Sequence, residues 1–319
     1  MLLAKTLRFL QICRLNAKCP PTTAWATAPL CGATQRLYAS SPIDMSFELF
    51  EGQTSDSSQT PLITMHGLFG SKQNWRGISK ALAQRTNRKI YAVDARNHGE
   101  SPHTTTHNSP SMSSDVRRFL EMRSYTKACL MGHSMGGRSM MFFAHKYPEM
   151  TERLIVVDIS PIRVPRSTGE MQRIFDAMIN LSLSPDLPLS EGRKLAQQQL
   201  LKATDSSETV QFIMLNLKKD PQTGAFSWAC NAKLLNEFLP RFQDYRSHFA
   251  SLPPYRGPTT FICGTQSPYM KREDWPQILE MFPNAEIHWL NAHHLVHFEQ
   301  PQQFISIVTE FLNRPLSAS

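Results

Sequence analysis

The stretch "KACLMGHSMGGRSMMFFAHKY", residues 127–147, passes from an apolar run through a G-x-S-x-G motif into a helical pattern without a linker. A strand that runs directly into a helix places its connecting residue in a strained turn, whose flanks must lack clashing Cβ atoms. Gly132 and Gly136 supply this clearance around Ser134. Gly137 adds room for the helix to pack closely on the strand. The flanks therefore favour a nucleophile elbow with Ser134 at its apex over a serine in a chance glycine-rich turn.

Short apolar runs alternate with helical patterns on both sides of this stretch, which predicts βαβ units and a mostly parallel sheet flanked by helices. The expected strands lie at residues 61–66, 89–95, 127–133, 153–160, 259–264 and 285–291. The expected helices lie at residues 73–84, 113–122, 135–146, 271–281 and 301–313. A hairpin around residues 45–52 is expected to start the sheet.

The alternation breaks over residues 165–253, after what we count as the sixth strand. This region contains no strand-like apolar run and shows helical stripes instead, such as the one that includes Met171, Ile174 and Phe175. An all-helical insertion between two sheet strands predicts a lid over the carboxyl edge of the sheet. The stripe either packs onto the core or lines an acyl pocket. On the second interpretation, Met171 and Phe175 are candidate substrate-binding residues.

The positive charge is concentrated at the amino terminus. The formal net charge is +8, but residues 1–43 hold five basic residues and no acidic one. Removing these five from the 34 basic residues leaves 29 against 26 acidic residues, a balance of only +3. A nearly neutral remainder gives no argument for a nucleic-acid partner. The sequence also contains no 18-residue uncharged apolar run, so no transmembrane segment is expected.

The first residues resemble a targeting segment. Leu3, Leu7 and Leu10 share one helical stripe, whereas Lys5 and Arg8 lie away from it. An amphipathic, basic segment without acids is typical of a mitochondrial transit peptide, and the two basic side chains interrupt the apolar run that a secretory signal needs. Cleavage near Ala39 and a matrix location are expected, with a disordered basic tail as the alternative. The expected division is therefore a transit peptide at 1–40, a core at 41–164 and 254–315, and the lid at 165–253.

The six cysteines give no sign of a metal centre or a disulfide framework. Three of them fall in the amino-terminal segment, at positions 13, 19 and 31. Cys129 and Cys263 lie inside expected strands and Cys230 stands alone, so no C-x-x-C spacing occurs. Buried thiols in a reducing compartment fit this usage, and no cofactor is expected.

An oxyanion hole, if Ser134 is a nucleophile, needs two backbone N–H donors. Met135, directly after the serine, is expected to supply one. Leu68, in the stretch "MHGLFGS" after the strand at 61–66, is expected to supply the other. His66 and Phe69 of the same stretch are candidate substrate-pocket residues, although His66 is better suited to brace the loop.

The general base is expected after the last strand, because the triad order in this architecture is serine, acid, histidine. The stretch "AHHLVH" there contains His293, His294 and His297. His294 is our candidate, since it lies in the loop immediately after the strand and at a suitable distance from the terminal helix. Three close histidines also suggest a metal site, but no further acidic or cysteine ligand stands at a sensible spacing. His293 and His297 are interpreted as pocket-wall or surface residues.

The acid is not at its usual place, since the loop "GTQSPYM" after the strand at 259–264 has no carboxylate. Glu273 and Asp274 come too late, on the next helix. Asp158 ends the strand that follows the elbow strand, and a carboxylate there is expected to reach Nδ1 of the histidine. The alternative role for Asp158 is a cap or salt bridge at the entrance of the lid.

Four motifs occur in order: H-G-L-F-G-S, D-A-R-N-H-G-E-S-P, G-H-S-M-G-G and V-D-I-S-P, which begin at residues 66, 94, 132 and 157. In the second motif, Asp94 and Arg96 are expected to form a structural ion pair near the elbow. Together the motifs resemble the α/β-hydrolase superfamily, and within it the subfamily of α/β-hydrolase domain-containing protein 11 and small bacterial esterases. The resemblance covers residues 45–313 and implies an α/β-hydrolase fold.

The same resemblance implies a mitochondrial serine hydrolase with esterase or lipase activity, a small-molecule acyl ester or lipid such as diacylglycerol as substrate, and a possible mitochondrial enzyme-complex partner. The sequence departs from the family at two positions. Lys233 stands where related proteins have a proposed lid acid, and His293 stands where a glycine is usual before the histidine base. A thioesterase, a C–C hydrolase and a non-catalytic binding partner remain alternatives, whereas Ser134 excludes enzymes of this fold with an aspartate nucleophile.

Overall fold

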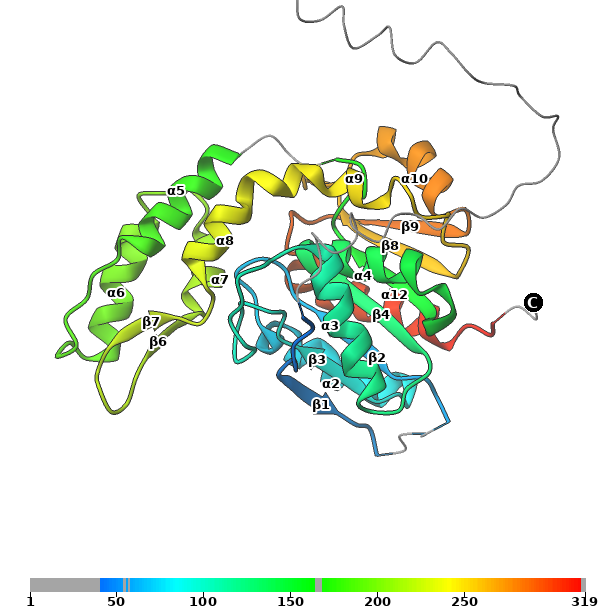
Figure 1. Ribbon diagram of the computed structural model, residues 1–319, viewed down its shortest axis with the longest axis horizontal. Coiled ribbons are helices and arrows are strands. Elements are labelled where there is room, and N and C mark those ends of the chain that lie inside the picture. Colours follow the sequence, from blue (N-terminus) through cyan, green and yellow to red (C-terminus); the bar gives the residue numbers. More distant parts are fainter. Residues whose placement is uncertain (1–40, 54–55, 57, 164–167, 317–319) are drawn as a thin grey trace, which may run out of the picture. The chain divides into compact units, whose positions relative to one another are not determined.

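The computed structural model describes residues 41–53, 56, 58–163 and 168–316 (Figure 1). The expected transit peptide at 1–40 and the start of the lid at 165–167 lie outside the described residues. No helix in the described part of the chain is long and apolar enough to span a membrane.

The central sheet has seven strands in the order β1-β3-β2-β4-β5-β8-β9. The strands are β1 (Phe47–Phe50), β2 (Leu62–Met65), β3 (Ile90–Val93), β4 (Ala128–His133), β5 (Thr151–Val157), β8 (Thr259–Gly264) and β9 (Ala285–Leu290). All neighbours are parallel except β1, which pairs antiparallel with β3. The hairpin expected around 45–52 is wrong: in the described residues one strand lies there, because its partner is β3 and not a neighbouring segment.

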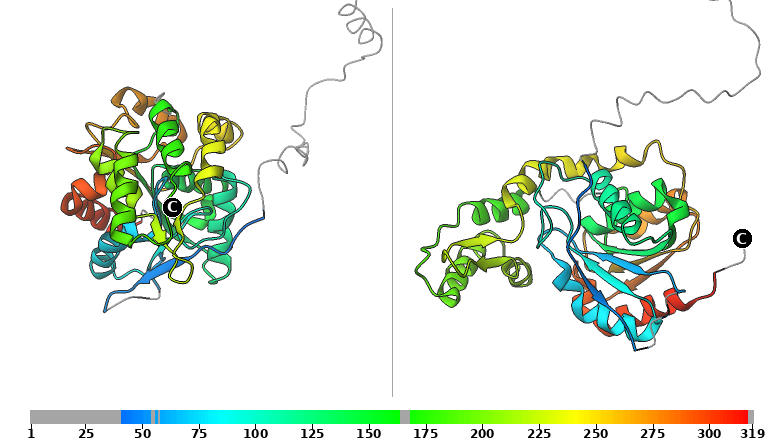
Figure 2. Two further views of the ribbon diagram at one scale, coloured as in Figure 1. Left: turned by 90° about the vertical axis from the view of Figure 1, so that its left-hand side faces the viewer. Right: turned by 60° about the horizontal axis from the view of Figure 1, so that its bottom comes forward.

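Helices cover both faces of the sheet, as the two views of Figure 2 show. They are α2 (Arg76–Thr86), α3 (Ser109–Glu121), α4 (Met135–Lys146), α10 (Trp275–Met281), α11 (Val296–Glu299) and α12 (Pro301–Asn313). Successive strand residues point to opposite faces. Leu130 therefore packs with α3, α4 and α10 in one core, whereas Cys129 and Met131 pack with α2 and α12 in the other. The predicted α/β-hydrolase fold is confirmed.

The insertion after β5 forms a cluster of its own. It contains α5 (Thr168–Ile179), α6 (Leu189–Leu200), α7 (Ser207–Met214), β6 (Leu217–Lys219), β7 (Phe226–Trp228), α8 (Ala232–Phe238) and α9 (Tyr245–Phe249). The expectation of an all-helical lid is wrong, because β6 and β7 pair as an antiparallel hairpin. In the described residues the lid follows the fifth strand, since β1 replaces the expected hairpin. Phe249 of α9 packs in the main core and not with the other lid helices.

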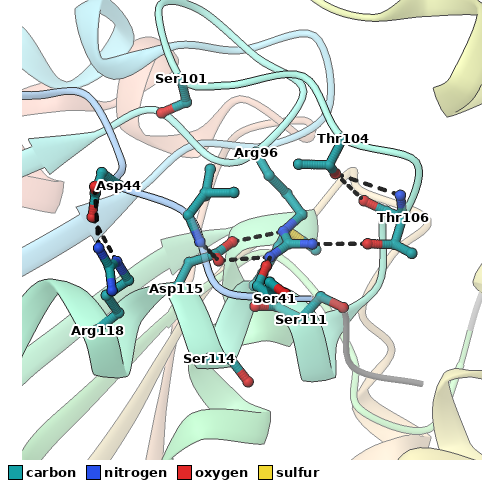
Figure 3. Close-up of polar contacts among 12 residues, drawn as sticks. Ser41, Asp44, Arg96, Ser101, Thr104, Thr106, Ser111, Ser114, Asp115 and Arg118 are labelled. Atoms are coloured by element: carbon teal, nitrogen blue, oxygen red, sulfur yellow. Dashed lines mark hydrogen bonds and ion pairs between the residues drawn. The ribbon is translucent and has the colours of Figure 1, made fainter. Parts of the chain in front are cut away.

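The expected ion pair between Asp94 and Arg96 does not form, because each side chain faces a different element. Arg96 binds both carboxylate oxygens of Asp115 on α3, at 2.7 and 2.6 Å, with both side chains fully buried (Figure 3). Asp94 instead accepts hydrogen bonds from the backbone and the side chain of Lys72, each at 2.6 Å. Each buried charge thus has a partner, as desolvation requires.

Candidate active site

Ser134 lies between β4 and α4 with φ 52° and ψ −113°. Positive φ is uncommon for a residue with a Cβ atom and stores strain, which is typical of a nucleophile elbow. Its N–H donates to the carbonyl oxygen of Val157 at 3.0 Å, which ties the elbow to the end of β5. The serine is partly exposed, whereas Met135 after it is buried.

The glycines around the elbow have no space for a side chain. A Cβ atom on Gly132 would lie 2.4 Å from the backbone of Gly136, and one on Gly136 would lie 2.5 Å from the carbonyl oxygen of Met65. A Cβ atom on Gly137 would lie 2.7 Å from Ile159. Strand β4, helix α4 and strand β2 therefore approach one another more closely than any other residue type would permit.

His294 and Asp158 meet at the carboxyl edge of the sheet. Nδ1 of His294 lies 2.6 Å from Oδ2 of Asp158, and the carboxylate is fully buried. Because a carboxylate only accepts, Nδ1 carries a proton, so in the neutral form of the imidazole Nε2 of His294 is the nitrogen with the free lone pair. Oδ1 of Asp158 accepts the N–H of Gly264 at 2.9 Å. The carboxylate is thus oriented by the strand next to its own.

Two residues of the loop after β8 complete this arrangement, and sequence reasoning missed both. The hydroxyl of Ser267 donates to Oδ2 of Asp158, the oxygen that His294 also binds. The ring of Tyr269 stacks on the imidazole of His294. The loop "GTQSPYM" lacks a carboxylate but offers this hydroxyl and this aromatic ring, which are the only signals in the sequence for the two contacts.

The loop after β2 makes a tight turn beside the elbow. Gly70 donates its N–H to the carbonyl oxygen of Gly67 at 2.9 Å, and Phe69 has φ 61°. A Cβ atom on Gly67 would lie 3.3 Å from Cβ of Ser134, so the turn lies directly against the serine. Across the described residues, the backbone N–H groups of Leu68 and Met135 donate to no other protein atom. Both remain available to a ligand atom near Ser134.

The four candidate substrate-binding residues divide into two groups. His66 is buried, accepts the N–H of Ala95 at 3.1 Å and donates to the carbonyl oxygen of Gly67 at 2.8 Å, so it braces the loop. Phe69 and Phe175 are buried with ring centroids 4.9 Å apart, within the lid cluster. Met171 is half-buried at the edge of that cluster. The helical stripe therefore mainly packs the lid.

The other histidines near His294 differ in their surroundings. His293 is exposed and lies 3.1 Å from Glu299. His297, interpreted as a wall or surface residue, is instead buried and stacks on Trp75 with centroids 4.6 Å apart. Burial lowers its pKa to about 3, and burial also lowers the pKa of His133 well below its ordinary value. These two imidazoles are therefore uncharged at neutral pH. The described residues contain no group of three or more potential ligands that could hold a metal ion.

Residues 60–301 match the family model of the alpha/beta hydrolase fold, so the chain belongs to this family. It is similar to the sn-1-specific diacylglycerol lipase ABHD11 of Danio rerio, with 37% identity over 85% of this chain and 83% of that protein. The protein of the same name from Mus musculus is 36% identical over 85% of this chain and 86% of its own length. Among solved structures, a marine microorganism esterase has a TM-score of 0.75 and 29% identity, over 84% of this chain and 99% of that one. The resemblance inferred from the four motifs is confirmed.

Proposed function

We propose that the protein is a serine hydrolase that cleaves carboxylic esters through an acyl-enzyme on Ser134. The observation that carries this proposal is the strained elbow at Ser134 together with the hydrogen bond of 2.6 Å between His294 and Asp158. His294 removes the proton from the serine hydroxyl, and the oxygen attacks the ester carbonyl carbon. The C–O bond to the alcohol then breaks and His294 protonates the leaving alcohol. Water, activated by the same imidazole, hydrolyses the acyl-enzyme.

The backbone N–H groups of Leu68 and Met135 stabilise the oxyanion of each tetrahedral intermediate in this mechanism. The availability of both donors and the position of the turn at Gly67 beside Ser134 support this role. The lid holds the turn in place, because the side-chain amide of Asn216 donates to the carbonyl oxygen of Phe69. Removing one oxyanion donor typically reduces turnover about 10²- to 10³-fold.

The substrate class is a lipid ester, with diacylglycerol as the first candidate. The name of the vertebrate relatives, sn-1-specific diacylglycerol lipase, supports this choice. Met171, at the half-buried edge of the lid cluster, is the candidate for contact with the acyl chain. Phe69 and Phe175 support Met171 in the same cluster, where their side chains are buried against each other.

The chain is proposed to act in the mitochondrial matrix after removal of residues 1–40, with the core at 41–164 and 254–315 and the lid at 165–253. The basic, acid-free start of the sequence supports the location. Import of the full chain into isolated mitochondria tests it, with residues 41–319 alone as the matched control. Import of the truncated chain would count against the leader.

Labelling with a fluorophosphonate probe tests the proposed mechanism. The folded protein should react at Ser134 and then hydrolyse a chain-length series of esters and acylglycerols. The alternatives have their own outcomes. Faster turnover of acyl thioesters than of esters would assign the same residues to a thioesterase. Faster turnover of β-diketones than of esters would assign them to a C–C hydrolase. A folded protein that resists the probe at Ser134 would support a non-catalytic binding partner, for which a mitochondrial enzyme complex is the candidate.

A further inference from the structure

The loop after β8 contains no carboxylate, and its aromatic residue contacts the candidate base. The ring of Tyr269 lies on the imidazole of His294 with centroids 3.9 Å apart and an angle of 24° between the planes. This is a stacked contact over the face of the base. We propose that Tyr269 is a positioning residue, whose ring holds the imidazole of His294 in the one orientation that serves Ser134. The inference rests on the proposed function and deepens it.

Tyr269 is itself held firmly by the strand end that carries the acid. Its carbonyl oxygen accepts the N–H of Ser160 at 3.0 Å, two residues after Asp158. Its own N–H donates to the hydroxyl oxygen of Ser267 at 3.2 Å, and that hydroxyl donates to Asp158. The ring, the serine and the carboxylate are therefore connected through a short series of hydrogen bonds. A rigid support of this kind allows the ring to restrict a neighbouring side chain.

The hydrogen bond to Asp158 does not by itself prevent one rotation of the His294 ring. It fixes Nδ1, but the imidazole can still turn about the line between Nδ1 and the carboxylate oxygen, which swings Nε2 away from its target. A flat ring at 3.9 Å blocks this rotation, because an imidazole that turned would collide with it. Burial raises the pKa of the Tyr269 hydroxyl, so the ring remains a neutral phenol beside the base. In the described residues no hydrogen bond joins that hydroxyl to another group, which assigns the contact to the ring.

Misplacement of a reacting group by about 1 Å costs on the order of 10²-fold in rate. Tyr269→Leu, which removes the flat face, should therefore lower kcat about 10- to 100-fold and leave KM within about twofold, because the ester-binding groups are unchanged. Tyr269→Phe keeps the ring and removes only the hydroxyl, so it should retain kcat within about twofold. Thermal melts of both variants establish that they are folded. Equal kcat for Tyr269→Leu and the unchanged protein overturns the proposal, as does a loss in Tyr269→Phe as large as in Tyr269→Leu.

A second measurement decides the point even if the protein hydrolyses no ester. Protons above an aromatic ring resonate upfield, so the carbon-bound imidazole protons of His294 report the stack in a sample with labelled histidine. The unchanged protein and Tyr269→Phe should each give one upfield-shifted set of His294 signals. Tyr269→Leu should move them downfield and broaden them through exchange between orientations. Sharp, unmoved signals in folded Tyr269→Leu overturn the positioning role, whereas absent esterase activity with the expected shifts rejects only the proposed function.

Discussion

Nε2 of His133 lies 2.9 Å from the backbone carbonyl oxygen of His294, so the residue before the elbow serine holds the peptide group of the candidate base. In the sheet, β4 and β9 are separated by β5 and β8. The bond therefore fixes the distance between the end of β4 and the loop after β9, which no strand pairing connects directly. Because a carbonyl oxygen only accepts, Nε2 of His133 carries its proton.

His133→Phe keeps a ring of similar size and removes this donor. The partly buried carbonyl of His294 loses its partner, which costs about 1–3 kcal/mol and loosens the loop that carries the candidate base. We expect kcat/KM for an ester to fall about tenfold or more, together with a lower Tm. His133→Gln offers an amide donor and should recover part of both losses. An unchanged kcat/KM in His133→Phe, or no recovery in His133→Gln, would contradict the role of the donor.

Ser134→Ala should reduce turnover about 10⁴- to 10⁶-fold, since the acyl-enzyme cannot form. The fold should survive, because the substitution adds no atoms to the elbow. Steady-state hydrolysis and fluorophosphonate labelling measure the loss, and circular dichroism checks the fold. Ser139→Ala on the same helix is the matched control. Its buried hydroxyl donates to the carbonyl oxygen of Met135, one turn earlier in the helix, and lies 3.5 Å from Sδ of Met112. Residual labelling of Ser134→Ala would place the nucleophile elsewhere.

Asp158→Asn should lower kcat on the order of 10⁴-fold, because an amide donor opposite Nδ1 favours the wrong tautomer of His294. Glu237→Gln serves as the control, since this exposed carboxylate lies on α8 of the lid. It should leave kcat unchanged. The reverse ranking of the two variants would move the acid of the triad to the lid, and a loss below about tenfold for Asp158→Asn would remove it from the triad.

Asp115→Asn should destabilise the fold by about 3–5 kcal/mol, because it leaves the guanidinium of Arg96 buried without a counter-charge. The pair is fully buried, and Oδ1 of Asp115 also accepts the N–H of Ile43, which ties the start of the described chain to α3. Glu121→Gln, on the same helix, breaks only the exposed pair with Arg117 and should cost less than about 0.5 kcal/mol. Urea unfolding measures both. Similar urea midpoints for the two variants would contradict the expectation that the buried ion pair stabilises the fold more than the exposed one.

Acid should destabilise the protein through His297. Its pKa is about 3 in the fold and about 6.5 in an unfolded chain, so between these values the unfolded state binds the proton more readily. The contribution to stability is complete above about pH 6.5 and is lost as the pH falls toward the folded value. His297→Phe keeps a ring against Trp75 and removes the titration. The difference in unfolding free energy between pH 7 and pH 5 should shrink by about 2 kcal/mol. An unchanged difference would show that His297 does not titrate in this range.

Local features of the fold followed directly from adjacent residues. The elbow at Ser134 is predictable because Gly132 and Gly136 stand beside it in the chain, and the structure has the expected strand, turn and helix there. The strands of the sheet also lie within a few residues of their expected positions, because apolar runs and glycines mark their ends locally. Parallel strands bring their carboxyl ends to one edge, which is why the sequence also indicated Asp158 and His294 as neighbours.

Partners that depend on packing were decided only by the tertiary structure. Nothing in the sequence distinguishes an arginine that binds Asp94 from one that binds Asp115. The sequence also does not indicate that His297, a polar residue, packs against Trp75 in the fold. Nor does it indicate that the ring of Tyr269 lies 3.9 Å from the ring of His294. Chain neighbours fix the backbone of a turn, because steric clashes act over a few bonds. The neighbours of a buried side chain come from distant segments, and their identity is set only once the sheet and its helices have packed.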